Sequence, residues 1–380
     1  MGGVSDSQPG AADLYVSDRL ELARRATADA GLDAMLITPG ADLRYLTGYQ
    51  AHPLERLTCL VVQAADAPFL VVPELERPAA LASPAAGLGI EITGYAETDN
   101  AYELIARRLP ANTRLFAVDN HMWAEKLLSM EAALPGAQAT LAGDLLSSLR
   151  MRKSPAEVAA LRRAGAAIDQ VHRRIGEWLR PGRTEREVAK DIAAAIIDAG
   201  HATVDFVIVG SGPNGASPHH EVSDRVIESG DPVVVDIGGT LPEGYCSDST
   251  RTYAVGEPPA AFRELYEVLL AAQSAQTEAV RPGITAEELD AVGRDLITQA
   301  GYGEQFIHRT GHGIGLETHE EPYIVAGSGR PLEAGMAFSI EPGIYLPGTF
   351  GARIEDIAVC TEDGGERLNL TGRDLVVLPG

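Results

Sequence analysis

Five side chains that can bind metal ions are spread over the C-terminal part of the chain. They are Asp236, Asp248, His312, Glu341 and Glu355. Four carboxylates and one imidazole form an oxygen-rich ligand set, which suits a pair of divalent cations better than one structural zinc ion. If the five side chains converge in the folded protein, we predict a hydrolase that uses two metal ions.

The sequence around the acids explains why they would need a cation. Asp236 ends the apolar run in VVVDIGG, and Glu341 ends the run in AFSIEPG. An acid that emerges from a buried strand is costly unless it is paired or coordinated. Clustered carboxylates also raise each other's pKa unless bound cations remove the repulsion. Any one of these acids could be a surface residue at a strand end, but the whole set favours a metal centre.

Further histidines lie near these motifs, namely His219, His308 and His319. His312 itself lies between two glycines, which lets the backbone approach a ligand closely. His308 and His312 have the i, i+4 spacing of a helical zinc motif. However, Arg309 stands where that motif has a glutamate, and the glycines disfavour a helix, so a zinc peptidase of the HExxH type is rejected.

Residues 210–215, GSGPNG, match a dinucleotide-binding fingerprint and follow the apolar run VDFVIV. That fingerprint needs a helix that opens at its last glycine. The residues that follow here contain a proline, many polar side chains and no helical period. We therefore predict no nucleotide binding. The small residues would instead let a loop carry His219 into the site.

An internal repeat begins with Arg-Pro-Gly-Arg-Thr at residues 180–184, which recurs as Arg-Pro-Gly-Ile-Thr 101 residues later. In each copy the threonine and a glutamate three residues on form a capping box that opens a helix, and a glycine should end that helix. The residues are Thr184, Glu187 and Gly200 in the first copy and Thr285, Glu288 and Gly301 in the second. Chance similarity between helix starts could explain this element alone.

The spacing of the acids continues the repeat. A glycine lies six residues before the first acid of each copy, and a second acid follows 12 or 14 residues after the first. The residues are Gly230, Asp236 and Asp248 in one copy and Gly335, Glu341 and Glu355 in the other. Each half is therefore predicted to be two helices followed by a hairpin with two acids. Packing about a pseudo-two-fold axis would bring four carboxylates together.

We predict two domains in an α/β (α+β) chain. Residues 1–148 alternate between helix-like and strand-like segments, without a catalytic cluster. Ser154, Pro155 and Glu157 have the pattern of a capping box that opens a long helix just after the boundary. Residues 149–380 form the second domain, which contains the repeat and the ligand set.

Composition excludes several partners. The net charge of -23 argues against nucleic acid and against anionic membranes. No apolar run approaches the ~18 residues of a membrane span, and the N-terminus lacks the features of a signal peptide. Three cysteines without CxxC spacing are typical of reduced, buried thiols. We therefore expect a cytoplasmic protein.

The segments GHGIGLETHEEP, SIEPGIY, ARIEDIAV and the DIG and SDSTRT pair resemble the pita-bread metallopeptidases of the prolidase and aminopeptidase P group. ADLRYLTGY near the N-terminus resembles the creatinase-like domain that this group carries. The resemblance covers nearly the whole chain. It implies an N-terminal creatinase-like domain and a pseudo-two-fold pita-bread domain.

The resemblance also implies a role for each ligand. Asp236 and Asp248 would hold one ion, His312 and Glu341 the other, while Asp248 and Glu355 bridge the two. A hydroxide would lie between the ions, and Glu341 would act as general base. In the same group, His219 and His319 stabilise the tetrahedral intermediate and shuttle protons, and His308 lines the proline side of the pocket. Residues that orient the carboxylates would be Arg353, Thr250 and, less directly, Tyr345.

The activity that the resemblance implies is hydrolysis of the Xaa-Pro bond of dipeptides or short peptides by a homodimer. Mn(II) or Co(II) would suit the oxygen-rich site better than Zn(II). Some prolidases have an arginine that grips the dipeptide carboxylate where this chain has Tyr323. An aminopeptidase P that accepts longer Xaa-Pro-Yaa peptides is therefore a second interpretation. Creatinase activity is disfavoured because creatinase does not use the metal set, and a catalytically silent binding protein is the non-enzyme alternative.

Overall fold

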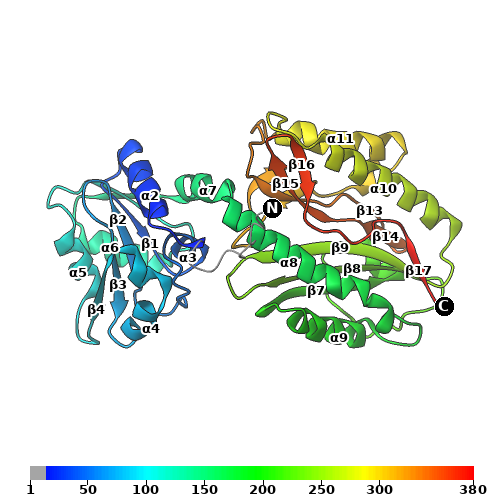
Figure 1. The fold of residues 1–380 in the computed structure, drawn as a ribbon, viewed down its shortest axis with the longest axis horizontal. Helices are drawn as coiled ribbons and strands as arrows, with labels where there is room; N and C mark the ends of the chain where they lie inside the picture. Colours follow the sequence, from blue (N-terminus) through cyan, green and yellow to red (C-terminus); the bar gives the residue numbers. More distant parts are fainter. Residues whose placement is uncertain (1–13) are drawn as a thin grey trace, which may run out of the picture. The chain divides into compact units, whose positions relative to one another are not determined.

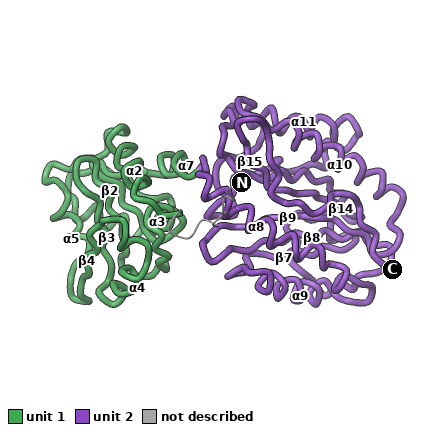
Figure 2. Tube along the Cα trace, viewed as in Figure 1, with its two compact units in different colours: residues 1–150 green, residues 151–380 purple. Residues whose placement is uncertain are grey.

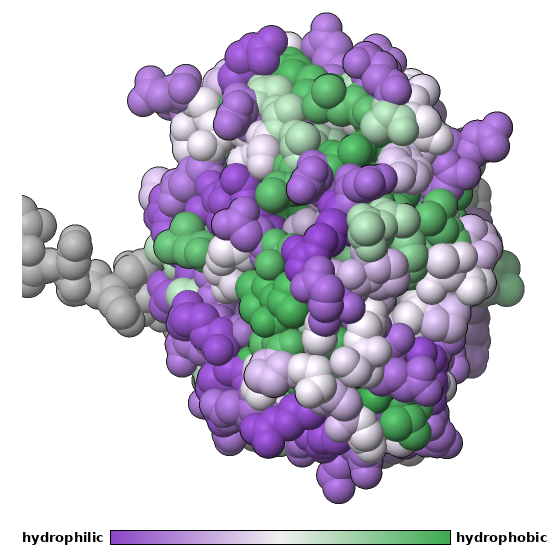
Figure 3. All heavy atoms as spheres, turned by 90° about the vertical axis from the view of Figure 1, so that its right-hand side faces the viewer, coloured by the Kyte–Doolittle hydropathy of each residue, from purple (hydrophilic) through white to green (hydrophobic). Residues whose placement is uncertain are grey.

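The computed structural model describes residues 14–380. The expectation about a signal peptide falls mostly on residues 1–13, outside the described part. The chain divides into two compact units, residues 1–150 and 151–380 (Figure 2). Among the described helices, none is long and apolar enough to cross a membrane. On the face drawn in Figure 3, areas of hydrophobic side chains are interrupted by hydrophilic ones.

The first unit contains a six-stranded sheet with the order β4-β3-β2-β1-β5-β6. The strands are β1 Ala34–Ile37, β2 Cys59–Gln63, β3 Phe69–Pro73, β4 Glu91–Tyr95, β5 Leu115–Val118 and β6 Gln138–Leu141. The helices are α2 Asp18–Asp29, α3 Ala41–Thr47, α4 Arg77–Ala82, α5 Ala101–Arg108, α6 Ala124–Ala133 and α7 Gly143–Met151, with the 3-10 turn η1 Pro84–Leu88. Strand β2 pairs antiparallel with β1 and β3, and the other pairings are parallel.

The second unit places its helices against two main sheets (Figure 1). The first sheet has the order β17-β9-β8-β7, and the second has the order β11-β10-β12-β15-β16. The helices are α8 Pro155–Arg173, α9 Glu185–Asp198, α10 Ala260–Ala279 and α11 Ala286–Gln299, with the 3-10 turns η2 Ile175–Glu177, η3 Gly212–Ala216 and η4 Gly303–Gln305. The strands are β7 Thr203–Ser211, β8 Pro232–Thr240, β9 Cys246–Val255, β10 Gly311–Gly313, β11 Glu320–Ile324, β12 Ala337–Ile340, β13 Gly343–Leu346, β14 Phe350–Arg353, β15 Asp356–Thr361, β16 Gly364–Arg367 and β17 Val376–Leu378.

Within the second unit, the helices of each half of the repeat bury apolar side chains against the strands of the same half. In the first half, Ile168 of α8 and Ile192 of α9 pack with Val235 of β8. In the second, Leu289 of α11 packs in one cluster with Phe338 of β12. Burial of these apolar side chains holds the strands that carry the acids.

The two copies of the internal repeat have the same local backbone structure. Thr184 and Thr285 each form the expected capping box. The helices that they open are followed by Gly200 and Gly301, whose φ values of 107° and 91° lie in the left-handed region. Ahead of the helices, the amide of Gly182 donates to Ile227 and that of Gly283 to Leu332, both at 2.9 Å. These equivalent contacts confirm the predicted pseudo-symmetry.

The second hairpin differs from the prediction. Strands β8 and β9 form one continuous antiparallel pair that includes Asp236 and Asp248. In the other half β12 pairs with β15, but Glu341 and Glu355 lie just outside both strands, and β13 and β14 pair separately. Pro342 follows Glu341 directly and has no N–H to donate, so the ladder is interrupted there.

Candidate metal centre

The first two acids are positioned by the register of strands β8 and β9. Asp236 lies opposite Thr250, and Asp248 lies opposite Gly238. Side chains two residues apart in a strand point to the same face of the sheet. Asp236 and Asp248 are therefore diagonal neighbours on one face, as the hairpin prediction requires.

His312 is the central residue of the short strand β10, between β11 and β12. The two glycines around it allow a very close approach of the neighbouring strands. A Cβ atom on Gly311 would overlap the carbonyl oxygen of Ser339, and one on Gly313 would overlap that of Glu321. Only glycine fits on either side of the histidine, which gives the GHG segment its structural reason.

Backbone hydrogen bonds fix the other two acids. The amide of Glu341 donates to the carbonyl of Thr310 at 2.8 Å, beside strand β10. The amide of Glu355 donates to the carbonyl of Thr250 at 3.0 Å, on strand β9 of the other half. Glu355 is thus attached directly to the strand that carries Asp248.

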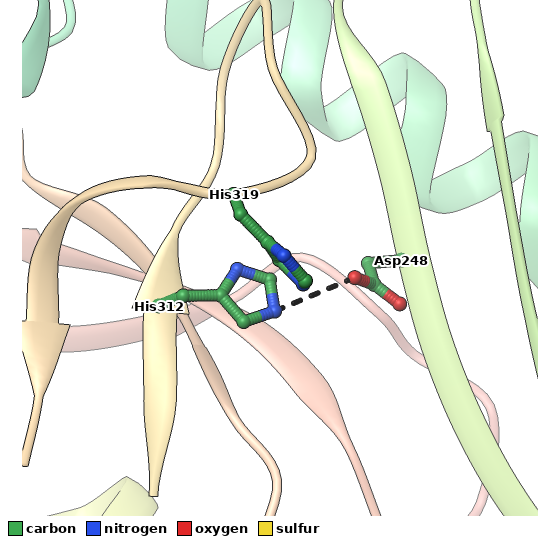
Figure 4. Close-up of side chains that lie close together, drawn as sticks. All are labelled: Asp248, His312 and His319. Atoms are coloured by element: carbon green, nitrogen blue, oxygen red, sulfur yellow. Dashed lines mark ion pairs between the residues drawn. The ribbon is translucent and has the colours of Figure 1, made fainter. Parts of the chain in front are cut away.

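All five predicted ligands come together. Their ligand atoms form overlapping groups in which every member lies within 4.8 Å of the others. The groups are Asp236, Asp248 and Glu355; His312, Glu341 and Glu355; and Asp248, His312 and His319. In Figure 4, His312 on β10 points toward Asp248 on β9, with the ring of His319 beside them. The Nε2 atom of His312 lies 3.1 Å from Glu341 and 3.7 Å from Asp248.

The electrostatics of this cluster fit bound cations. Burial, and then the charges of Glu355, Asp236 and Glu341, raise the pKa of Asp248 well above its usual value. Burial and the neighbouring acids Glu341 and Asp236 do the same to Glu355. Among residues 14–380, no donor forms a hydrogen bond with the buried oxygens Asp236 Oδ1 and Glu355 Oε1. Acceptor oxygens that lack donors and carboxylates that repel one another are both satisfied by divalent cations.

The pKa of Glu341 is shifted in the opposite direction from those of Asp248 and Glu355. Burial opposes its ionisation, but the hydrogen bond and the charge of His312 outweigh that cost and lower its pKa to about 2. Ser339 Oγ also donates to Glu341 at 3.1 Å and accepts from the backbone amide of His312 at 3.0 Å. Ser339 is a site residue that the sequence did not single out.

Arg353 and Thr250 form hydrogen bonds with the carboxylates. The buried guanidinium of Arg353 donates to Asp236 and, at 3.1 Å, to the hydroxyl of Thr250. Thr250 in turn donates to Glu355 at 2.6 Å. The two residues therefore connect one acid from each half. The orienting role expected for them stays a prediction.

Tyr345 and His308 extend this network. The hydroxyl of Tyr345 accepts from Arg353 at 2.9 Å and lies 2.9 Å from Nε2 of His308. Arg353 also donates to the carbonyl of Pro218 at 3.3 Å. Through these contacts the guanidinium reaches the segment that carries His219.

A cavity of about 890 Å³ opens over the acids, a size typical of small-ligand sites. Its wall includes the ligand set and all three candidate histidines, His219, His308 and His319. Phe206, Ile208, Ile307 and Arg309 also line it, and the sequence did not identify them as site residues. Phe206 and Ile208 are two residues apart on β7, so strand periodicity could have placed them on one face.

Comparison with known proteins places this site in a family. Residues 159–362 match metallopeptidase family M24, and residues 19–152 match the Creatinase/Prolidase N-terminal domain. The chain is 54% identical over 368 residues to the probable dipeptidase PepE of Mycobacterium tuberculosis, covering 97% of this chain and 98% of that protein. It is 41% identical over 362 residues to the Xaa-Pro dipeptidase of Lactobacillus helveticus, covering 92% and 96%.

A solved structure is equally similar. The dipeptidase PepE of Mycobacterium ulcerans superposes with a TM-score of 0.92 at 53% identity, over 97% of this chain and 99% of that one. The chain therefore belongs to metallopeptidase family M24. The protein is a metallopeptidase with a creatinase-like N-terminal domain and a pita-bread C-terminal domain, which confirms the predicted family and fold. Membership of this family implies divalent metal ions.

Proposed function

We propose that this metallopeptidase hydrolyses the Xaa-Pro bond of dipeptides or short peptides with two divalent ions. The convergence of four carboxylates and His312 beneath one cavity carries the proposal. The names of the relatives, dipeptidase PepE and Xaa-Pro dipeptidase, support the substrate class. The Xaa-Pro bond has no N–H, so enzymes that bind substrate as a hydrogen-bonded strand handle it poorly.

The residues divide the chemistry between them. Asp236, Asp248, His312, Glu341 and Glu355 would hold the ions, which supply a water of lowered pKa at neutral pH. Glu341 lines the cavity and would accept the proton of the attacking water. His219 and His319 both line the cavity, where they would stabilise the oxyanion and carry the proton taken from the water to the leaving nitrogen. His308 would line the proline subsite, held by the hydroxyl of Tyr345.

We propose Mn(II) as the resident metal, with Co(II) as an alternative. The donor set is four carboxylates and one imidazole, and carboxylates suit Mn(II). Zn(II) favours thiolate and imidazole ligands, and would be the less suitable occupant. Activity of metal-free protein reconstituted separately with each of the three ions checks this preference, and the Mn(II) form is expected to be the most active.

The peptide panel is the first test. Protein loaded with Mn(II) is expected to cleave Xaa-Pro peptides and to leave matched Xaa-Ala peptides essentially intact, measured by release of the free N-terminal residue. Appreciable Xaa-Ala turnover would contradict proline selectivity. A protein that binds no divalent metal and cleaves no Xaa-Pro peptide would instead be the catalytically silent binding protein.

The second candidate is an aminopeptidase P that acts on longer Xaa-Pro-Yaa peptides, favoured by Tyr323 at the position of a prolidase arginine. Arg309 offers a different cation for a dipeptide carboxylate. It lines the cavity, and its guanidinium carbon lies 4.2 Å from the centre of the Tyr323 ring. Among the described residues, no carboxylate forms an ion pair with it. We therefore favour the dipeptidase.

Replacement of Arg309 by alanine separates the two candidates. It is expected to raise KM for an Xaa-Pro dipeptide by roughly 10- to 100-fold, because a hydrogen bond to a charged group is lost. The matched substrate is the same dipeptide with an amidated C-terminus, whose KM should not change. An equal rise in KM for the amidated dipeptide would show that Arg309 does not bind the C-terminal carboxylate of the substrate.

Three further proposals concern the whole molecule. We propose that residues 149–380 form the catalytic domain and residues 1–148 the creatinase-like domain. We propose a homodimer, which sedimentation at working concentration tests, and a monomer would contradict it. A cytoplasmic location is supported by three buried, free thiols, Cys59, Cys246 and Cys360.

A further inference from the structure

A fully buried carboxylate lies at the start of helix α9, outside the set of metal ligands. Glu185 is the first residue of α9 and follows the capping residue Thr184. Its side chain is 0% exposed. A buried carboxylate is costly unless several donors satisfy its oxygens. The capping box already uses Glu187, so the helix itself does not need Glu185.

The donors to Glu185 all come from one segment, residues 211–223. Ser211 donates through its amide at 2.8 Å and its hydroxyl at 2.7 Å. Ser223, at the other end, donates through its amide at 3.1 Å and its hydroxyl at 2.6 Å. Asn214 donates at 3.0 Å, and Nε2 of His220 lies 2.7 Å from the carboxylate. One carboxylate therefore gathers both ends and the middle of the segment.

This arrangement gives the segment GSGPNG a function. Strand β7 runs through its first two residues, and the 3-10 turn η3 follows in place of the helix that a nucleotide would need. Ser211 and Asn214 of the motif both donate to Glu185. The motif serves to attach the segment to α9.

The same segment carries His219 to the cavity. His219 has an anchor on each side in the chain. His220 contacts Glu185, and the carbonyl of Pro218 accepts from Arg353 at 3.3 Å. His219 itself is exposed in the cavity wall. Its position is therefore set by its neighbours.

The internal repeat shows that Glu185 is specific to this segment. The equivalent residue of the second half is Ala286, which also follows a capping threonine and is also buried. The segment with His319 is held differently, because Lys153 forms a buried ion pair at 2.8 Å with the neighbouring Glu320. A glutamate is present only in the half whose histidine segment binds it.

We propose that Glu185 is a positioning residue that holds residues 211–223, and through them His219, in place for the reaction. This inference rests on the proposed function. Burial opposes ionisation of Glu185, but hydrogen bonds from Ser223, Ser211 and His220 outweigh it and lower its pKa to about 2. The carboxylate is thus charged at neutral pH.

Hydrogen exchange of the full-length protein loaded with Mn(II) tests the contact without substrate. In Glu185→Gln, an NH₂ group would face donors, so amides of residues 211–223 are expected to exchange roughly 10- to 100-fold faster. Amides of β8 and β9, and the metal content, should not change. The control is Asp119→Asn, another buried carboxylate, which accepts from Thr38 and His121 in the first unit. Unchanged exchange in residues 211–223 would overturn the proposal.

A double-mutant cycle tests the link to His219. Glu185→Gln is expected to lower kcat roughly 100-fold, as a misplaced group does. In a His219→Ala background the same change should alter kcat less than about twofold, because no histidine remains to be positioned. An equal loss in both backgrounds would overturn the proposal. If Glu185→Gln does not fold, Ser223→Ala replaces it in both experiments. Inactive wild-type protein would refute the proposed function, while the exchange result would still decide the role of Glu185.

Discussion

Glu355→Gln is expected to lower kcat/KM for an Xaa-Pro dipeptide by roughly 10³-fold or more. Glu355 belongs to two of the ligand groups and would therefore help to hold both predicted ions. A metal site supplies several kcal/mol of transition-state stabilisation, and each 1.36 kcal/mol corresponds to a factor of ten. Steady-state rates and metal content per chain are measured together. The control is Glu362→Gln, an exposed acid seven residues further along.

The same variant, although less active, is expected to be more stable than wild type when no metal is bound. In the metal-free protein the folded-state pKa of Glu355 is raised, so its charged form destabilises the fold at neutral pH. Glutamine removes that cost, and metal-free Glu355→Gln should unfold at a higher temperature than metal-free wild type at pH 7. The advantage should shrink as the pH falls toward the ordinary value of 4.5. A variant less stable than wild type in chelator at pH 7 would contradict the repulsion argument.

Arg353→Met is expected to lower the free energy of unfolding of the metal-free protein by about 3–5 kcal/mol. Removal of one partner of a buried ion pair leaves the other charge uncompensated. Here the cation has several buried acceptors, including Asp236 and Thr250. Denaturant unfolding in chelator measures the loss. In the metal-loaded protein the loss should be smaller, because the ions compensate the same carboxylates.

Two variants define the specificity of that result. Arg162→Met removes the exposed ion pair with Glu366 and should cost no more than about 1 kcal/mol. Arg353→Lys should recover only part of the stability, since an ammonium lacks the planar fork that reaches several acceptors at once. A loss for Arg353→Met no larger than that for Arg162→Met would show that Arg353 does not support the acids.

Local signals in the sequence predicted the parts of the site that local physics controls. The two capping boxes and the VVVDIGG strand depend on nearest neighbours, so helices α9 and α11 and the hairpin with Asp236 were predictable. The interruption after Glu341 was also visible as Pro342, although the hairpin prediction did not use it. The internal repeat was the one long-range signal, because it predicted that the two pairs of acids meet at the junction of the halves.

The remaining contacts depend on tertiary packing. Nothing beside Glu185 in the sequence indicates that residues 211–223 will surround its carboxylate. Similarly, Arg309 served only to reject a zinc motif, because its place in the cavity depends on how β10 and β11 pair. Ser339 was missed because a serine within an apolar strand has no distinctive pattern. The individual metal roles of the five ligands stay predictions.

The hydrogen bond from the amide of Glu355 to the carbonyl of Thr250 joins the two halves of the second unit at the metal centre. Each half contributes only two acids, so neither half made as a separate fragment would retain a complete pair of ion sites. Bound ions would therefore crosslink the two halves at their junction. Opening of that junction would first require release of the ions, and chelation should speed global unfolding far more than it changes the structure of either half.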